Sequence, residues 1–457
     1  MNIKTNYKKY CLFILPFVFL FLQGIYTNNQ YAAIILLSAI CAAGMKLSSK
    51  VLFPAVIMVF GFIISSVLNR QGFAFIYELS KIAVLLIFAS CDNEKTLKKG
   101  IFYACSISSI IGIIAYIFNI SAFDLIDIID GQKNIQGTFG YANTMAVSSG
   151  IGAILSYYYI KKDNGSHFWY DLFLISNIIC LYLTRSRFAI VAFGASILVA
   201  VFLKYRKSRA YITSLLSVIF LGTICLFITG KESLLLQPTV VLRLTYWKDA
   251  IKLLKGSPFG IGIHRWLELQ ASIQEVDYSV KFVHNSILQL MLDGGIICGV
   301  GFLIFYMRTF VEKLKKNDIL GVSLLVFIAL HAFFDIDFCY GAVWLVLGVV
   351  ASDVDKNINI KKWFLILAIA MLSVTIIAFP EKSAARDYPM ECTELLNEER
   401  YDELSKLCDE WIEKAPHRQL AYDMKYVALK RLGDEKGLED LKELEDKMNI
   451  VWQGETE

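Results

Sequence analysis

Charged residues are scarce in this sequence of 457 residues: Asp, Glu, Lys and Arg make up 19%, whereas 56% of the residues are hydrophobic. Soluble domains usually contain about 25% charged residues, so the composition excludes an ordinary soluble globular protein. Hydrophobic runs that can cross a bilayer, each needing about 20 residues, recur along the chain. The net charge of +4 is small; it gives no sign of a nucleic-acid partner, and none is expected.

Two short motifs are also missing. The ten cysteines form no Cys-X-X-Cys pair, so the sequence carries no such signature of a zinc or redox site. Most of them lie in hydrophobic runs and are expected to pack as small apolar side chains. Cys392 and Cys408 fall in a polar segment, and the sequence does not decide whether they are bridged. No Ala-X-Ala cleavage site follows the first hydrophobic run, Tyr10 to Tyr26, which therefore predicts an uncleaved first helix.

Hydropathy predicts an all-α polytopic membrane protein with about 12–13 transmembrane helices. The expected spans are 10–26, 31–45, 51–68, 73–90, 100–119, 141–160, 168–184, 187–203, 210–229, 285–307, 318–338, 340–352 and 363–380. With a cytoplasmic N-terminus, Lys and Arg are concentrated in the loops on the inner side, as short cytoplasmic loops require. These inner loops contain Lys46, Lys50, Lys95, Lys98, Lys99, Lys161, Lys162, Lys204, Arg206, Lys207, Arg209, Arg308, Lys313, Lys315, Lys316, Lys356, Lys361 and Lys362.

The spans divide the chain into four parts. Helices 1–9 occupy 1–229, a long extracytoplasmic loop with an amphipathic helix occupies 230–284, helices 10–13 occupy 285–380, and a charged helical tail occupies 381–457. In the tail, the segments around Leu404 and Leu438 repeat at a spacing of 34 residues, which resembles tetratricopeptide repeats. A plain helical hairpin is the alternative. Such helices usually present a binding surface, so the outward tail is a candidate site for a protein partner.

Arginines interrupt the expected depletion of positive charge on the outer side. Arg185 and Arg187 lie where the eighth span begins. They can extend toward the headgroups of membrane lipids. Alternatively, they form an anion site, because a guanidinium binds phosphate oxygens with two parallel hydrogen bonds.

The long outer loop contains a predicted amphipathic helix. Its apolar stripe is expected to comprise Val240, Leu244, Trp247, Ile251 and Leu254. A helix lying at the membrane interface explains this stripe. Arg243 borders one edge, beside Ala250, where it can lean over the surface that the stripe covers. Pro258, Gly260 and Gly262 are expected to form a tight turn after the helix.

A histidine follows at the outer mouth of the tenth span. His284 and Asn285 begin this span, and Asp293 is expected roughly 13 Å deeper at 1.5 Å per residue. Gly295 and Gly299 have the spacing of close helix packing. Arginines with a nearby histidine, and no cluster of metal-ligand residues beside them, suit a lipid diphosphate held without metal. The histidine would accept a proton from an incoming sugar hydroxyl, or orient that hydroxyl by a hydrogen bond, and the arginines would stabilise the departing diphosphate.

Five motifs in this order resemble the O-antigen ligase and O-antigen polymerase superfamily over about residues 10–352. They are "SR" at Ser186–Arg187, "LRLTYW" at Leu242–Trp247, "SPFGIGIHRW" at Ser257–Trp266, "HNSILQLMLDGGIICG" at His284–Gly299 and "HAFFDIDF" at His331–Phe338. "FGYANTMA" (Phe139–Ala146) resembles a segment that commonly has Pro-Asn. Here Ala142 replaces the proline, so only Asn143 is transferred.

The resemblance implies a membrane glycosyltransferase of the GT-C type that uses no metal and no other cofactor. Its donor would be an oligosaccharide linked to polyprenyl diphosphate, its acceptor a glycan, lipid or protein, and its location the outer face of the bacterial plasma membrane. The resemblance assigns donor binding to Arg187 and Arg243, and the acceptor side to His284. Further candidates for substrate binding are Arg185, Arg265, Asn285, His331, Asp335 and Asn143. His331 and Asp335 are expected to share a helix face because they are four residues apart; a buried polar contact is the other interpretation.

Two other functions fit a polytopic protein. A flippase for lipid-linked glycans, or another transporter, would show internal repeats with broken helices in corresponding halves, and the sequence shows no such symmetry. Glu78 and Lys81 are the only charged pair deep in a predicted span, and at this spacing they can simply pair with each other. A non-catalytic scaffold that acts through the tail is the third hypothesis. The sequence does not separate a ligase from a polymerase.

Overall fold

Helices form almost all of the computed structural model, which describes residues 3–26, 28–129, 132–163, 167–205, 238–274, 278, 280–378, 388–414 and 419–448. Every predicted span within these residues contains an α-helix, although the helix in span 318–338 ends at Ala332. The predicted ninth span, 210–229, lies outside the described residues. The first helices are α1 (Ile3–Phe21), α2 (Asn28–Ala42), α3 (Ser49–Leu68), α4 (Phe75–Ser90), α5 (Glu94–Phe118), α6 (Ala142–Lys162), α7 (Phe168–Leu183) and α8 (Arg187–Tyr205). They are followed by α10 (Pro238–Gly256), α11 (Trp266–Leu269), α12 (Ser286–Lys315), α13 (Ile319–Ala332), α14 (Gly341–Ala351) and α15 (Lys362–Ala378).

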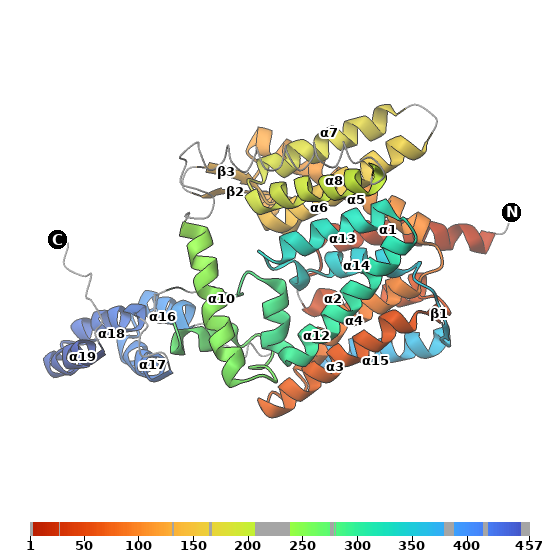
Figure 1. Cartoon of the computed structure of the whole chain (residues 1–457). Coiled ribbons are helices and arrows are strands. Elements are labelled where there is room, and N and C mark those ends of the chain that lie inside the picture. Colours follow the sequence, from red (N-terminus) through yellow and green to blue (C-terminus); the bar gives the residue numbers. More distant parts are fainter. Residues whose placement is uncertain are drawn as a thin grey trace.

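The hydrophobic helices pack side by side into one bundle (Figure 1). In the described part of the chain, four of them are long and apolar enough to cross a membrane: α3, α5, α8 and α12. Shorter apolar helices, including α7, α13 and α14, complete the bundle. Helices suit this setting because they satisfy their own backbone hydrogen bonds without water.

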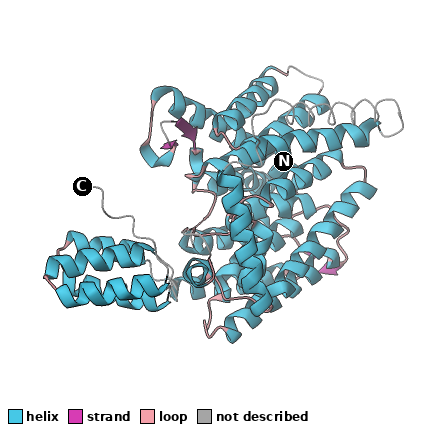
Figure 2. Ribbon diagram, turned by 60° about the vertical axis from the view of Figure 1, so that its left-hand side comes forward, coloured by secondary structure: helices cyan, strands magenta, loops and turns pink. Residues whose placement is uncertain are grey.

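The tail forms a separate group of helices beside the bundle (Figure 2). It consists of α16 (Tyr388–Asn397), α17 (Tyr401–Lys414), α18 (Gln419–Leu432) and α19 (Glu435–Met448). These helices bury their own apolar cluster, in which Leu404 is fully buried. Helices α17 and α19 start 34 residues apart, in agreement with the repeat spacing. No disulfide joins Cys392 and Cys408, whose Sγ atoms lie 3.9 Å apart on the adjacent helices α16 and α17.

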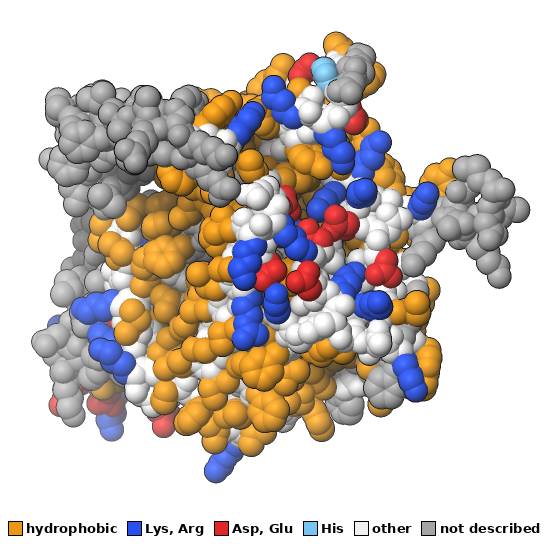
Figure 3. All heavy atoms as spheres, turned by 45° about the vertical axis from the view of Figure 1, so that its right-hand side comes forward, with side chains coloured by type: hydrophobic (Ala, Val, Ile, Leu, Met, Phe, Trp, Pro, Cys, Tyr) orange, Lys and Arg blue, Asp and Glu red, His pale blue; other side chains and the backbone are white. Residues whose placement is uncertain are grey.

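One end of the bundle is lined by oppositely charged side chains, which gather on the face turned forward in Figure 3. Here Lys50 Nζ lies 2.7 Å from Glu312 Oε1, and Lys313 Nζ lies 2.8 Å from Asp318 Oδ2. Lys356 donates hydrogen bonds to backbone carbonyls of the α4–α5 loop. Strands β1 (Lys46–Leu47) and β4 (Ile358–Asn359) pair antiparallel at the same end. Loops predicted to be cytoplasmic therefore meet at one end of the bundle.

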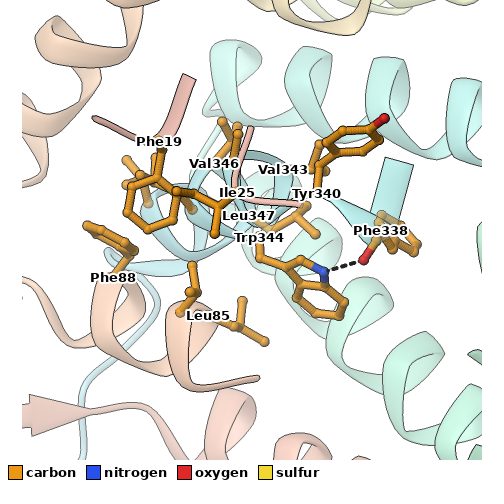
Figure 4. Close-up of a cluster of buried hydrophobic side chains, with 14 of the residues drawn as sticks. Phe19, Ile25, Leu85, Phe88, Phe338, Tyr340, Val343, Trp344, Val346 and Leu347 are labelled. Atoms are coloured by element: carbon orange, nitrogen blue, oxygen red, sulfur yellow. Dashed lines mark hydrogen bonds between the residues drawn. The ribbon is translucent and has the colours of Figure 1, made fainter. Parts of the chain in front are cut away.

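Helix α14 lies at the centre of the bundle, with all of its residues from Gly341 to Ala351 buried. Phe19, Leu85 and Phe88 of the neighbouring helices α1 and α4 surround it (Figure 4). Two backbone N–H groups at its start donate to carbonyls of the loop after α1, with N–O distances of 3.0 Å. A helix this short is stabilised by burial on all sides, and it fixes the loop that precedes it.

That preceding loop, together with a β-hairpin, occupies the other end of the bundle. The loop connects α13 to α14 and includes the 3₁₀ turn η4 (Asp337–Cys339). The hairpin pairs β2 (Ile126–Ile129) with β3 (Gln132–Ile135), with Ile126 opposite Ile135. Short 3₁₀ turns flank it at η1 (Ala122–Asp124) and η2 (Gly137–Phe139), and η3 (Gln270–Ser272) follows α11. The candidate site is at this end.

The expected tight turn follows α10, with Gly260 N donating to Ser257 O at 2.9 Å, and the segment 257–264 that contains it inserts into a break in α12. The backbone of Gly295 has φ 75° and ψ 174°, which interrupts the helix. Ile296 N donates to Pro258 O at 2.9 Å, and Ile261 N donates to Leu292 O at 2.8 Å. In a continuous helix Ile296 N would bond Leu292 O. The loop therefore satisfies the backbone groups that the break exposes, as non-helical backbone within a membrane requires.

Candidate functional site

Asp335 is the centre of the polar cluster at this end of the bundle. It lies in the loop between α13 and α14 and is 1% exposed. Tyr141, which precedes α6, donates its hydroxyl to Asp335 Oδ1 at 2.8 Å. Asn143 Nδ2 donates to Oδ2 at 2.5 Å and to the Tyr141 hydroxyl at 3.0 Å. The backbone N–H of Ile336 also donates to Oδ1, at 2.8 Å. The Asp335 carboxylate is therefore fixed from several sides.

Arg243 and His284 approach the same carboxylate from elements distant in sequence. Arg243 Nη2 of α10 lies 3.2 Å from Asp335 Oδ2, and His284 Nδ1 lies 3.6 Å from Oδ1. The Arg243 guanidinium also lies over the ring of Phe188 in α8, 5.2 Å from its centroid. Among the described residues, Arg243 Nη1 and His284 Nδ1 are buried without a hydrogen-bond partner. The site thus contains an unsatisfied guanidinium nitrogen close to an imidazole nitrogen.

The surrounding groups keep Asp335 ionised. Burial alone would raise the pKa of this carboxyl, but the proximity of His284 and the charges of Arg243 and His331 outweigh burial and hold the pKa well below its usual range. Burial and the nearby Asp335 carboxylate raise the pKa of Tyr141 well above its ordinary value. Tyr141 therefore remains a hydrogen-bond donor to an anionic Asp335.

The start of α12 fixes the position of His284. Asn285 is buried and caps this helix by accepting hydrogen bonds from the backbone N–H groups of Ile287 and Leu288. Ser286 donates to the backbone carbonyl of Asp335 at 2.6 Å, which ties the helix to the Asp335 loop. His284 itself has φ 52°, a left-handed conformation that is uncommon for residues other than glycine. The cap gives Asn285 a structural role, and its predicted contact with substrate stays a prediction.

The prediction that His331 and Asp335 share a helix face is wrong. Helix α13 ends at Ala332, so Asp335 lies beyond it in the loop. His331 is fully buried and pairs instead with Asp337, with 2.7 Å between Nδ1 and Oδ2. Its Nε2 lies 3.4 Å from Ser186 Oγ, and this contact links α13 to the segment before α8. His331 thus lies behind the Asp335 cluster and supports it.

The remaining predicted arginines are more distant from Asp335. Arg185 and Arg187 are both exposed at the start of α8, and Arg185 donates to Gln132 of the hairpin. Arg187 is the residue before Phe188, whose ring the Arg243 guanidinium covers. Arg265 pairs with Glu268 at 3.1 Å, away from the cluster. The structure therefore brings together Asn143, Arg243, His284 and Asp335, with Arg187 at the edge.

The buried face of α10 differs from the predicted apolar stripe. Val240 and Leu254 of the predicted stripe are buried and Trp247 is partly buried, but Leu244 and Ile251 are 50% and 43% exposed. Tyr246 and Ala250 are buried instead. Helix α10 packs on α12 and on the loop that follows it. The buried face of α10 is therefore shifted toward Ala250 relative to the predicted apolar stripe. Arg243 lies on the Ala250 side of the helix, and its side chain reaches Asp335.

Sequence reasoning missed Tyr141 and Phe188 as parts of the site. Tyr141 lies in the segment that supplied Asn143, and Phe188 follows Arg187 directly. Phe188 is thus adjacent to a predicted residue, and Tyr141 lies two residues before one. Aromatic residues are common at membrane interfaces, however, so their type alone carried no signal.

Residues 172–306 match the family model described as O-antigen ligase. This part of the chain carries an O-antigen ligase family domain, which confirms the resemblance; the resemblance suggested from the sequence covers a longer stretch. The match runs from α7 to α12 and contains Arg187, Arg243 and His284. Together with the apolar helices, it identifies a multi-pass membrane protein of the kind that acts in surface polysaccharide biosynthesis. No curated protein matches the chain.

Proposed function

We propose that this chain, which carries an O-antigen ligase family domain at residues 172–306, transfers oligosaccharide from a polyprenyl-diphosphate-linked donor. The reaction takes place on the outer face of the bacterial plasma membrane. The Asp335 end of the bundle then faces outward, and the lysine-rich end faces the cytoplasm, in accord with the positive-inside rule. The transfer needs no nucleotide sugar, because the donor already carries the diphosphate leaving group.

One observation carries this proposal: Arg243 and His284 converge on Asp335, and Arg243 Nη1 and His284 Nδ1 lack hydrogen-bond partners among the described residues. A buried guanidinium nitrogen without an acceptor is costly. A phosphate oxygen would supply the missing acceptor and bind the guanidinium strongly. Arg187, exposed at the start of α8, can bind the same diphosphate from the side of Phe188.

The chemistry follows from these assignments. The acceptor hydroxyl oxygen forms a bond to the anomeric carbon, and the bond from that carbon to the diphosphate oxygen breaks. His284 accepts the hydroxyl proton as general base. Asp335 orients the imidazole and stabilises its charged form. Arg243 and Arg187 stabilise the negative charge that develops on the departing polyprenyl diphosphate.

The acceptor distinguishes two versions of this reaction. If the acceptor is another lipid-linked glycan, the enzyme is a polymerase; if it is a lipid or protein, the enzyme is a ligase. We propose that the tail, α16 to α19, is extracytoplasmic and that its tetratricopeptide-like helices bind a protein partner or the acceptor. Incubating the purified protein with lipid-linked oligosaccharide separates the two versions, since a polymerase gives a ladder and a ligase a single transfer.

Alanine substitutions test the site. In Arg187→Ala, Arg243→Ala and His284→Ala we expect transfer to fall by about 10² to 10³-fold, because each removes a charge or a base that acts in the transition state. Membrane insertion should persist. Product formation from lipid-linked oligosaccharide in proteoliposomes is the measurement.

Arg308→Ala is the matched control, because Arg308 is exposed on α12 near its other end. It should transfer glycan at the rate of the unmodified protein. Full activity in all three site variants would refute the assignment.

A flippase for lipid-linked glycans is the second candidate, and the break in α12 favours it, because transporters place binding sites at broken helices. No other membrane helix in the described part of the chain is broken in this way. Proteoliposomes with donor lipid only in the inner leaflet separate the two functions. Exposure of the glycan without a new glycosidic bond would support the flippase.

A further inference from the structure

A second buried polar cluster surrounds the break in α12. Glu78 and Lys81 of α4 form an ion pair of 2.5 Å, as their spacing predicted, and both are buried. Glu78 Oε1 also lies 3.2 Å from His264 Nε2, on the inserted loop. Asp293 of α12 is 2% exposed and accepts a hydrogen bond from the backbone N–H of His264 at 3.0 Å. This cluster has no role in the transfer chemistry proposed above.

The inserted loop is held from both sides. Gln71 accepts from Ile263 N at 2.6 Å and donates to Ile263 O at 3.1 Å, while Asn69 donates to Gly260 O at 3.1 Å. Gly260 has φ 96°, and an added Cβ would lie 2.7 Å from Gly295 N, so this approach requires glycine. The loop is therefore a fixed part of the bundle.

A chain of hydrogen bonds leads from this loop to His284. Gln289 Nε2 donates to both carboxylate oxygens of Asp293 at 3.1 Å. Gln289 Oε1 accepts from the backbone N–H of Val283 at 3.2 Å. Val283 and Gln289 are both buried, and Val283 immediately precedes His284. The left-handed backbone at His284 is thus held between the Val283 contact and the Asn285 cap.

We infer that Gln289 and Asp293 are positioning residues for His284, acting through the amide of Val283. The inference rests on the proposed role of His284 as general base. The Gln289 amide donates to Asp293 through its nitrogen and accepts from Val283 N through its oxygen. It therefore connects Asp293, which binds the inserted loop, to the residue that precedes His284. Small displacements matter here, because a misplacement of about 1 Å can cost about 10²-fold in rate.

Two substitutions at Gln289 test the inference. Gln289→Met keeps the approximate volume and removes both polar contacts; we expect kcat to fall at least about tenfold while the KM for donor changes less than about threefold. Gln289→Glu keeps an acceptor for Val283 but places a second carboxylate against Asp293, so a similar fall is expected. Thr309→Val, elsewhere in α12, removes only a bond to Phe305 O and is the matched control.

The double variant Gln289→Glu with Asp293→Asn reverses the polarity of the contact. The carboxylate introduced at position 289 can then accept from both Val283 N and the new amide at position 293, while that amide oxygen still accepts from His264 N. The net charge of the cluster is unchanged. We expect the double variant to recover most of the kcat that Gln289→Glu loses, which a loss of folding would not permit.

Hydrogen–deuterium exchange of a peptide covering 280–288 gives a readout that does not depend on activity. Gln289→Met should exchange faster than the unmodified protein, and the double variant should regain protection. The inference is overturned if Gln289→Met loses protection but keeps its kcat, if it keeps both, or if the double variant is no better than Gln289→Glu. If the unmodified protein transfers no glycan, the proposed function is refuted instead. The exchange data then still decide whether Gln289 holds the backbone of Val283.

Discussion

At the scale of single residues, Asp335 determines the geometry of the site. Its carboxylate binds the side chains of Tyr141, Asn143 and Arg243 and has His284 as a close neighbour. Buried ion pairs stabilise a fold only weakly in net terms, but removing one partner leaves an uncompensated charge and is costly. From the sequence, Asp335 is one of the further candidates for substrate binding. In the structure it is the common neighbour of Asn143, Arg243 and His284.

Asp335→Asn removes the countercharge while keeping the shape of the side chain. Because Arg243 then lacks its buried partner, we expect a loss of about 3 kcal/mol in stability and a large loss of transfer. The pKa of Asp335 is lowered in the folded protein, so its stabilisation is complete above the unfolded pKa of about 3.9 and is lost as pH falls through the folded pKa. Thermal unfolding at several pH values is the measurement.

The difference in Tm between the unmodified protein and Asp335→Asn should therefore persist at mildly acidic pH and shrink only below about pH 4. Asp124→Asn is the control, because Asp124 is exposed near the hairpin; its Tm should equal that of the unmodified protein. An Asp335→Asn variant with unchanged Tm and full transfer would contradict the central position of this carboxylate.

At the scale of elements, the break in α12 links the long loop to the membrane helices. Gly295 lies nine residues after Ser286, so the break is roughly 13 Å into the helix. The spacing of Gly295 and Gly299 predicts close packing against a neighbouring helix. The close contact between α12 and α3 lies instead at Gly61 of α3, where an added Cβ would lie 2.5 Å from the carbonyl oxygen of Gly294 in α12. Gly295 serves the break, because its backbone conformation is essentially restricted to glycine.

Gly295→Ala is expected to destabilise the protein by about 1–3 kcal/mol from backbone strain alone. The new Cβ would also meet the backbone of Phe259 at 2.6 Å and displace the inserted loop. Thermal unfolding and hydrogen–deuterium exchange of residues 257–264 measure the effect.

Gly194→Ala in α8 provides the comparison, since nothing lies within 4 Å of an added Cβ there. Its Tm should stay the same or rise slightly. If Gly295→Ala has the same Tm as Gly194→Ala and leaves the exchange of residues 257–264 unchanged, the loop does not insert into α12.

At the scale of the whole molecule, the chain consists of a membrane bundle and a helical tail with a core of its own. The tail buries Tyr388 against Trp411, with ring centroids 5.7 Å apart, and Tyr422 is fully buried. All residues of the candidate site belong to the bundle. This division separates the proposed transfer chemistry, outside the tail, from the proposed partner binding by the tail.

Deletion of residues 381–457 tests this division. We expect the truncated protein to insert into the membrane and to retain transfer of lipid-linked oligosaccharide in proteoliposomes, at a reduced rate if the tail docks the acceptor. A scaffold that acts only through the tail predicts the loss of all function. Transfer by the truncated protein, compared with that of His284→Ala in the full chain, separates the two.

The sequence by itself determined the membrane class, the positions of nearly all described helices and the grouping of the basic loops at one end. These features depend on local composition: a run of about 20 apolar residues must be buried in lipid, and Lys and Arg remain on one side. It also indicated Arg243 and His284 as candidates, because polar residues at span ends are costly unless they serve a purpose, and the family resemblance added Asp335 and Asn143.

Only the tertiary structure decided which of these residues meet. The pairing of His331 with Asp337, the shift of the buried face of α10, the contact of Arg243 with Asp335 and the insertion of the 257–264 loop into α12 join residues far apart in sequence or reverse a local preference. Periodicity describes the faces of one helix. It contains no information on which neighbour covers each face, because that is set by packing among all helices at once.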